Sequence, residues 1–225
     1  MDIFIIYGLT AIALIIVVAS QGYIKSAYSK YSKIQNKKGM TGKEAARLML
    51  DKNDLKNVKI EEVQGYLSDH YDPKTKTVRL STSNYHDASI AAVAVACHEC
   101  GHAIQDKKGY LFLRIRHGLV PFVNLATKLG YLAIVIGIIA QIIDLIWLGI
   151  IFELVILLFQ LVTLPVEFNA SSRALKKIKE YSILDDSEYK QGRTMLTAAA
   201  LTYVASVAST LIEIVRLILM FTRRD

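Results

Sequence analysis

The sequence predicts a mainly α-helical membrane protein with about four transmembrane helices and a small α+β domain on the cytoplasmic side. Apolar residues make up 53% of the 225 residues, more than the 45–50% typical of globular proteins. The mean hydropathy of +0.34 is high for the same reason. Long uncharged stretches alternate with two segments that each carry six basic residues, as in a chain that crosses a bilayer several times.

The first apolar stretch, Ile3 to Ala19, contains no charged residue and is long enough to span a bilayer with help from its flanks. Asp2 precedes it in place of a basic n-region, so we expect residues 1–22 to be a retained anchor rather than a cleaved signal. Because lysines near a span favour the cytoplasm, the N-terminus is expected outside. The lysines after this stretch are Lys25, Lys30, Lys33, Lys37, Lys38 and Lys43. This basic run follows an apolar segment directly, which favours contact with a lipid bilayer and not with nucleic acid.

Residues 23–117 are expected to form the cytoplasmic domain. Its pattern predicts a helix over 41–55, a strand over 58–63, a turn-rich loop over 65–73, a second strand over 74–81 and a helix over 87–105. Asp87 or Ser89 could cap the last helix. These pieces together predict a small α+β fold.

The helix over 87–105 carries the pattern H-E-x-x-H. His98 and His102 stand at i and i+4, so both imidazoles lie on one face and could hold one Zn²⁺ at about 2.0–2.1 Å. Glu99 is rotated by about 100° from His98, which places it beside the metal as a candidate general base. The two cysteines, Cys97 and Cys100, flank this pair. We expect small buried thiols, with a redox pair as the less favoured reading.

Residues 118–166 are too long for one span and predict a transmembrane hairpin with arms 119–143 and 145–166 that turns near Gln141 to Asp144. Glu153 in the second arm is either paired inside the bundle or near the surface. Residues 167–194 carry six basic residues and are expected to be a cytoplasmic helix. Residues 195–225 predict a last membrane helix, in which Glu213 and Arg216 could pair. Arg223 and Arg224 would then finish outside, so a helix lying in the interface is the competing prediction.

A catalytic zinc site needs a third protein ligand. The predicted topology returns the chain to the cytoplasmic face at Glu167, the first acidic residue there. From its position alone, Glu167 could equally be a structural glutamate in the first turn of a helix, where the helix dipole stabilises a negative charge. The alternative ligands are His70, His86, Asp106 and His117.

A resemblance to known families bears on this choice. H-E-x-x-H followed, after a transmembrane hairpin, by E-F-x-A resembles the HtpX-type membrane gluzincins, and the chain looks closer still to the YugP-type membrane zinc metallopeptidases of bacteria. The matching segments are residues 65–73, 78–81, 94–105 and 164–171.

The resemblance implies a zincin-like catalytic domain in a bacterial cell membrane, with Zn²⁺ held by His98, His102 and Glu167 and with Glu99 as the base. HtpX-type enzymes carry an aspartate four residues after the ligand glutamate, where this chain has Ser171. Asn169, Ser171 or a residue elsewhere in the chain could therefore orient a ligand histidine.

The function expected on these grounds is zinc-dependent hydrolysis of peptide or protein substrates at the cytoplasmic membrane face, in protein quality control. A zinc-binding membrane scaffold without turnover is the alternative, and the sequence does not fix the oligomeric state. His70 is the candidate oxyanion donor, although it could simply cap a turn; Tyr203 and Arg173 are weaker candidates. By analogy with gluzincins, Val78, Arg79, Leu80 and Ser81 are expected to form an exposed sheet edge that binds substrate.

Overall fold

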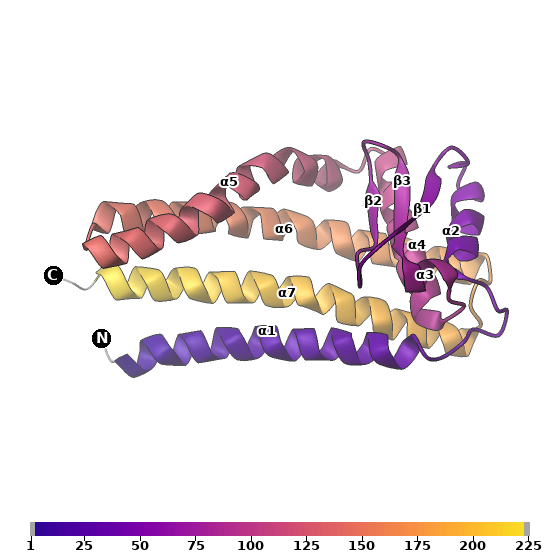
Figure 1. The fold of residues 1–225 in the computed structure, drawn as a ribbon, viewed down its shortest axis with the longest axis horizontal. Coiled ribbons are helices and arrows are strands. Elements are labelled where there is room, and N and C mark those ends of the chain that lie inside the picture. Colours follow the sequence, from indigo (N-terminus) through magenta and orange to yellow (C-terminus); the bar gives the residue numbers. More distant parts are fainter. Residues whose placement is uncertain (1–2, 223–225) are drawn as a thin grey trace. The chain divides into compact units, whose positions relative to one another are not determined.

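The computed structural model describes residues 3–222, so Asp2, Arg223 and Arg224 lie outside the described residues. The elements are α1 (Ile3–Tyr31), α2 (Gly42–Asp51), β1 (Lys59–Val63), β2 (His70–Asp72), β3 (Thr77–Ser81), α3 (Thr82–His86), α4 (Ile90–Lys107), α5 (Leu111–Ala140), α6 (Ile143–Glu180) and α7 (Asp186–Thr222) (Figure 1). They form two compact units. The first holds residues up to 21, 114–164 and from 201 onward, and the second holds residues 22–113 and 165–200.

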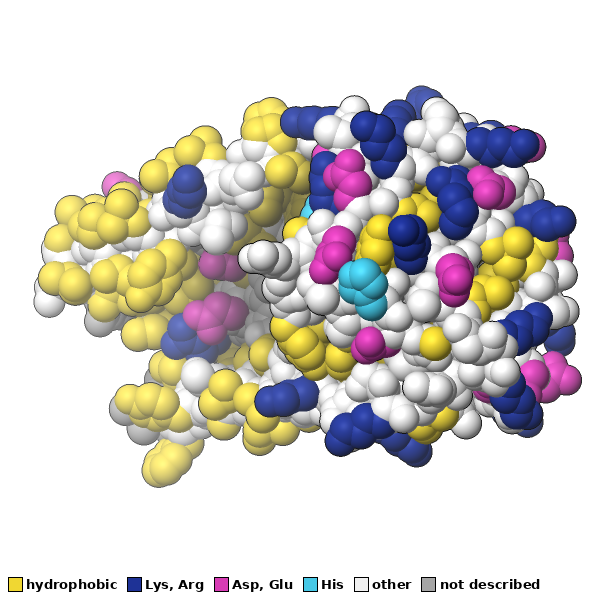
Figure 2. Space-filling model, turned by 45° about the vertical axis from the view of Figure 1, so that its right-hand side comes forward, with side chains coloured by type: hydrophobic (Ala, Val, Ile, Leu, Met, Phe, Trp, Pro, Cys, Tyr) yellow, Lys and Arg dark blue, Asp and Glu magenta, His cyan; other side chains and the backbone are white. Residues whose placement is uncertain are grey.

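Four helices, α1, α5, α6 and α7, are long and apolar enough to cross a membrane, as the sequence predicts. In the first unit many large hydrophobic side chains face outward (Figure 2). Leu125, Ile139 and Ile151, for example, are each about half or more exposed. Such a surface is unfavourable in water and suits a lipid environment.

The boundaries of α6 and α7 correct the prediction of a separate cytoplasmic helix over 167–194. Helix α6 continues through Pro165 to Glu180, and α7 already begins at Asp186. A proline removes only one backbone donor, and apolar helices often accommodate that loss. Asp185 caps α7, because its carboxylate accepts the amide of Glu188 at 2.9 Å while Glu188 accepts the amide of Asp185 at 2.9 Å. Glu167 therefore lies inside α6 rather than in a first turn.

The sheet has the order β1-β3-β2, with β1 parallel and β2 antiparallel to β3 (Figure 1). The central position of β3 corrects the prediction that Val78, Arg79, Leu80 and Ser81 form an exposed edge. The short strand β2 lies in the segment predicted as a loop, and its residues His70 to Asp72 pair with Arg79 to Thr77. Consequently the outer edges of the sheet belong to β1 and β2.

Helix α4 lies in the core of the second unit and is buried on almost every side. Ser89 caps its start, because the hydroxyl accepts the amide of Ala92 at 3.1 Å. Its small residues let neighbouring backbones approach closely. A Cβ added at Gly101 would lie 2.5 Å from the carbonyl oxygen of Ala170 on α6. This contact brings the residues after Pro165 against the H-E-x-x-H turn.

Candidate metal centre

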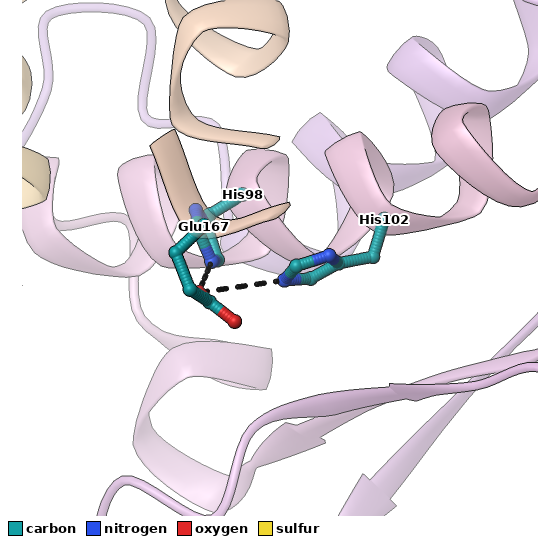
Figure 3. A group of neighbouring side chains, drawn as sticks. All are labelled: His98, His102 and Glu167. Atoms are coloured by element: carbon teal, nitrogen blue, oxygen red, sulfur yellow. Dashed lines mark hydrogen bonds and ion pairs between the residues drawn. The ribbon is translucent and has the colours of Figure 1, made fainter. Parts of the chain in front are cut away.

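His98 and His102 of α4 meet Glu167 of α6 in one group (Figure 3). The two imidazole rings lie one helical turn apart, with centroids 4.8 Å from each other and ring planes at 87°. Each of the three residues offers one atom, and these atoms all lie within 4.8 Å of one another. Within residues 3–222 this is the group of histidine, cysteine and acidic side chains whose spacing could hold a metal ion.

The two distances from the Glu167 carboxylate to the histidines are close to those around a tetrahedral ion. Oε2 of Glu167 lies 3.2 Å from Nε2 of His98 and 3.7 Å from Nε2 of His102. Two ligand atoms bound to tetrahedral Zn²⁺ at about 2.0–2.1 Å are separated by about 3.3 Å. Two imidazole nitrogens and one carboxylate oxygen are also a donor set that zinc accepts with an open fourth position. The residues present therefore fit a zinc ion.

The group is largely withdrawn from solvent. The exposed fractions of the side chains are 14% for His98, 10% for His102 and 4% for Glu167. Burying a carboxylate is unfavourable unless a positive charge or hydrogen-bond donors compensate it. A cation held between these three side chains provides that compensation. The two histidine side chains keep a small exposed fraction, so the group is not fully closed to solvent.

Each histidine uses its second ring nitrogen for a hydrogen bond inside the protein. Nδ1 of His98 lies 3.1 Å from Oγ of Ser171, and Nδ1 of His102 lies 2.9 Å from Oε1 of Gln105. Ser171, one of the two predicted partners, thus contacts a histidine directly. Asn169, the other, contacts Gln105 at 3.0 Å. Sequence reasoning did not single out Gln105, although its i+3 spacing from His102 places both side chains on one helix face.

Glu99 follows His98 on α4 and is 8% exposed. It is not one of the three residues of the metal-binding group. Its place on the helix agrees with the predicted rotation of about 100° from His98. Glu99 is thus a largely buried acidic residue that adjoins a ligand histidine in sequence and lies outside the metal-binding group.

The structure does not bring the other candidate ligands into this group. His70 lies exposed on the edge strand β2, where Nδ1 is 2.8 Å from the carbonyl oxygen of Ser68, as expected for a turn-capping histidine. His86 pairs with Glu62 at 3.0 Å. Asp106 accepts a hydrogen bond from Tyr71 at 2.7 Å and pairs with Lys76.

The remaining candidates belong to other surroundings. His117 on α5 and Tyr203 on α7 fall in the first compact unit. Arg173 on α6 donates through Nε to Oδ1 of Asn169 at 2.6 Å. Arg173 is therefore linked through Asn169 to Gln105, whose oxygen in turn lies against His102.

Cys97 and Cys100 are free thiols that are fully buried, as predicted. Burial raises the pKa of Cys97 to about 12. The pKa of Cys100 is also raised, mainly by burial. Its Sγ lies 3.6 Å from the carbonyl oxygen of Ala46, so this thiol packs against α2. Inert packing thiols explain these positions better than a redox pair does.

Comparisons with known proteins agree with this geometry. Residues 5–222 match the family described as "Putative neutral zinc metallopeptidase". The chain is also 44% identical over 202 residues to the "Putative membrane protease YugP" of Bacillus subtilis (strain 168), an alignment that covers 90% of each chain. No solved structure matches. A family match over nearly the whole chain, together with a relative of this identity, shows that the protein belongs to this zinc metallopeptidase family.

Proposed function

We propose that the protein hydrolyses peptide bonds with a zinc ion held by His98, His102 and Glu167. The observation that carries the proposal is the convergence of these three largely buried side chains from α4 and α6 at distances that suit one tetrahedral ion. Nothing in a purely structural zinc site requires an acidic side chain at position 99. For this reason we favour an enzyme over a zinc-binding scaffold.

The proposed mechanism gives each residue a separate task. When bound, zinc supplies Lewis acidity toward the scissile carbonyl and toward a water molecule. The Glu99 carboxylate takes a proton from the attacking water and passes it to the nitrogen of the leaving amine. Ser171 and Gln105 hold the rings of His98 and His102 through their Nδ1 atoms. His70 on β2, a strand that contacts α4, remains a proposed donor to the developing oxyanion.

We propose further that an extended substrate pairs with the open edge of β2 instead of with residues 78–81. The hydroxyl of Tyr71 on β2 donates to Asp106 at 2.7 Å, which ties this edge strand to the end of α4, one turn beyond His102. Main-chain pairing at an edge strand selects for extended conformation more than for particular side chains. Unfolded or membrane-extracted segments are therefore the substrate class we infer, consistent with a role in protein quality control at the cytoplasmic face.

The decisive measurement is bound zinc per chain in detergent-purified full-length protein, with Glu167→Ala, Glu99→Gln and Glu180→Gln beside the wild type. Hydrolysis of fluorescein-labelled casein is measured on the same samples. Glu180 is an exposed surface residue of α6 that pairs with Lys177, so its variant controls for the loss of an acidic side chain elsewhere.

We expect one zinc per wild-type chain and weakened zinc retention in Glu167→Ala. Glu99→Gln is expected to keep zinc while its hydrolysis rate falls by a factor of about 10² or more, the usual contribution of a general base. Wild-type protein without zinc would overturn the proposed function. Zinc retention with no hydrolysis by the wild type would favour the scaffold. Equal hydrolysis by Glu99→Gln and the wild type would overturn the assignment of Glu99 as the general base.

A further inference from the structure

Gln105 is a fully buried glutamine on α4 to which the proposed chemistry assigns no proton transfer and no metal contact. Glutamine is mostly found at protein surfaces, and a buried amide is unfavourable unless its polar atoms are hydrogen-bonded. Every polar atom of this amide has a partner: Val166 and Asn169 on α6, and His102 on its own helix. The arrangement of these partners determines which way the amide points.

The nitrogen of the Gln105 amide faces α6. Nε2 lies 2.8 Å from the backbone carbonyl oxygen of Val166, which can only accept a hydrogen bond. Nε2 also lies 3.0 Å from Oδ1 of Asn169. That atom is fixed as an oxygen because it accepts the Nε hydrogen of Arg173 at 2.6 Å, and a guanidinium only donates. Two independent acceptors therefore place the nitrogen on this side and the oxygen on the other.

The oxygen of the amide consequently faces His102. Oε1 of Gln105 lies 2.9 Å from Nδ1 of the imidazole, and an amide oxygen only accepts. Nδ1 must then carry the hydrogen, which leaves the lone pair of the neutral ring on Nε2. Nε2 is the atom that lies 3.7 Å from Oε2 of Glu167 (Figure 3).

We propose that Gln105 is a positioning residue that holds His102 in the Nδ1-protonated tautomer with Nε2 turned toward the metal. The inference rests on the proposed zinc site. The same amide also binds the carbonyl of Val166, the residue directly before Glu167. One side chain thereby links the second histidine on α4 to the backbone that presents the carboxylate on α6.

The test compares Gln105→Glu with Gln105→Met in full-length protein in detergent. Glutamate keeps an oxygen that can accept from Nδ1 of His102 but loses the donors to Val166 and Asn169. Methionine has a similar length, but it removes both the acceptor for His102 and the donors to Val166 and Asn169. Zinc affinity is measured by competition with a chelator, and helix content is measured on the same samples. Gln64→Met, at an exposed loop position, is the matched control.

We expect Gln105→Met to weaken zinc binding by about 10- to 100-fold, the usual effect of losing the partner that orients a ligand histidine. Gln105→Glu should lie much closer to the wild type, because the acceptor for His102 remains. The opposite order, in which glutamate is worse than methionine, would assign Gln105 a purely structural role in joining α4 to α6 and overturn the inference.

A second test uses only the wild type, so its result does not depend on whether the variants fold. In zinc-loaded protein with ¹⁵N-labelled histidine, we expect the ring proton of His102 on Nδ1 and the metal on Nε2. Coordination through Nδ1 would overturn the proposal, as would unchanged zinc affinity in Gln105→Met. Wild-type protein that binds no zinc would instead overturn the metal site itself, so the two failures are distinguishable.

Discussion

Cys97 and Cys100 occupy the turn of α4 that carries the metal-binding histidines, yet both thiols are fully buried. A reagent must reach sulfur before it can react, and neither thiol is open to solvent in the folded chain. We therefore expect no labelling of the native protein by a maleimide and labelling of both cysteines after denaturation in detergent. Replacing each cysteine with alanine should leave hydrolysis within a few-fold of the wild type. Rapid labelling of the native protein, or loss of activity in both variants, would revive a redox role.

The histidine pair could be predicted from the sequence because i, i+4 spacing on a helix fixes which side chains share a face. Glu167 could not be predicted in this way, since its distance from α4 depends on how α6 packs. For that residue the family resemblance was needed. Gln105 was missed for the opposite reason: its spacing was visible, but the demand for a partner at Nδ1 of His102 arises only in the folded site.

At the scale of elements, the contact between α4 and α6 sets the position of the third ligand. Gly101 makes it possible, because a Cβ there would lie only 2.5 Å from the carbonyl oxygen of Ala170. Such overpacking typically costs about 1–3 kcal/mol of stability and displaces the backbone. We expect Gly101→Ala to reduce zinc affinity in the folded protein, by moving Glu167 away from the histidines.

The matched control is Gly22→Ala on α1, where an added Cβ meets nothing within 4 Å. Chelator competition for zinc and helix content are measured on both variants. We expect Gly22→Ala to match the wild type. If Gly101→Ala binds zinc as tightly as the control, the close approach of the two helices at Gly101 does not determine where α6 places Glu167.

The helices were easier to predict than the sheet. Capping residues mark α2, whose Thr41 and Glu44 form a reciprocal capping box, and Ser89 marks α4. Strand β2 has only three residues and no alternating pattern of its own. It forms because β3 offers a free edge, which is a tertiary condition that periodicity does not reveal. The error about residues 78–81 followed directly from overlooking this strand.

At the scale of the whole molecule, the sequence predicted about four transmembrane helices, and four helices of the described chain are long and apolar enough to cross a membrane. The turn between α5 and α6 lies at 141–142, within the predicted region, and Gln141 adopts a left-handed φ of 58° there. What composition could not give was the length of each helix. Helices α1, α6 and α7 all continue beyond their apolar parts, because capping and contacts within the second unit, rather than hydropathy, determine where a helix ends.

The orientation of the chain in the membrane follows from charge and the number of crossings. If all four helices cross and the basic segments are cytoplasmic, the α5–α6 turn and both termini lie outside. In intact cells a membrane-impermeant maleimide should then label Asp144→Cys, whereas Lys56→Cys should react only after permeabilisation. The buried native cysteines give no background. A C-terminal epitope tag should be accessible from outside, and a tag detected only inside would mean that α7 does not cross. Labelling of Lys56→Cys from outside would place the metal centre on the external face and exclude cytoplasmic substrates.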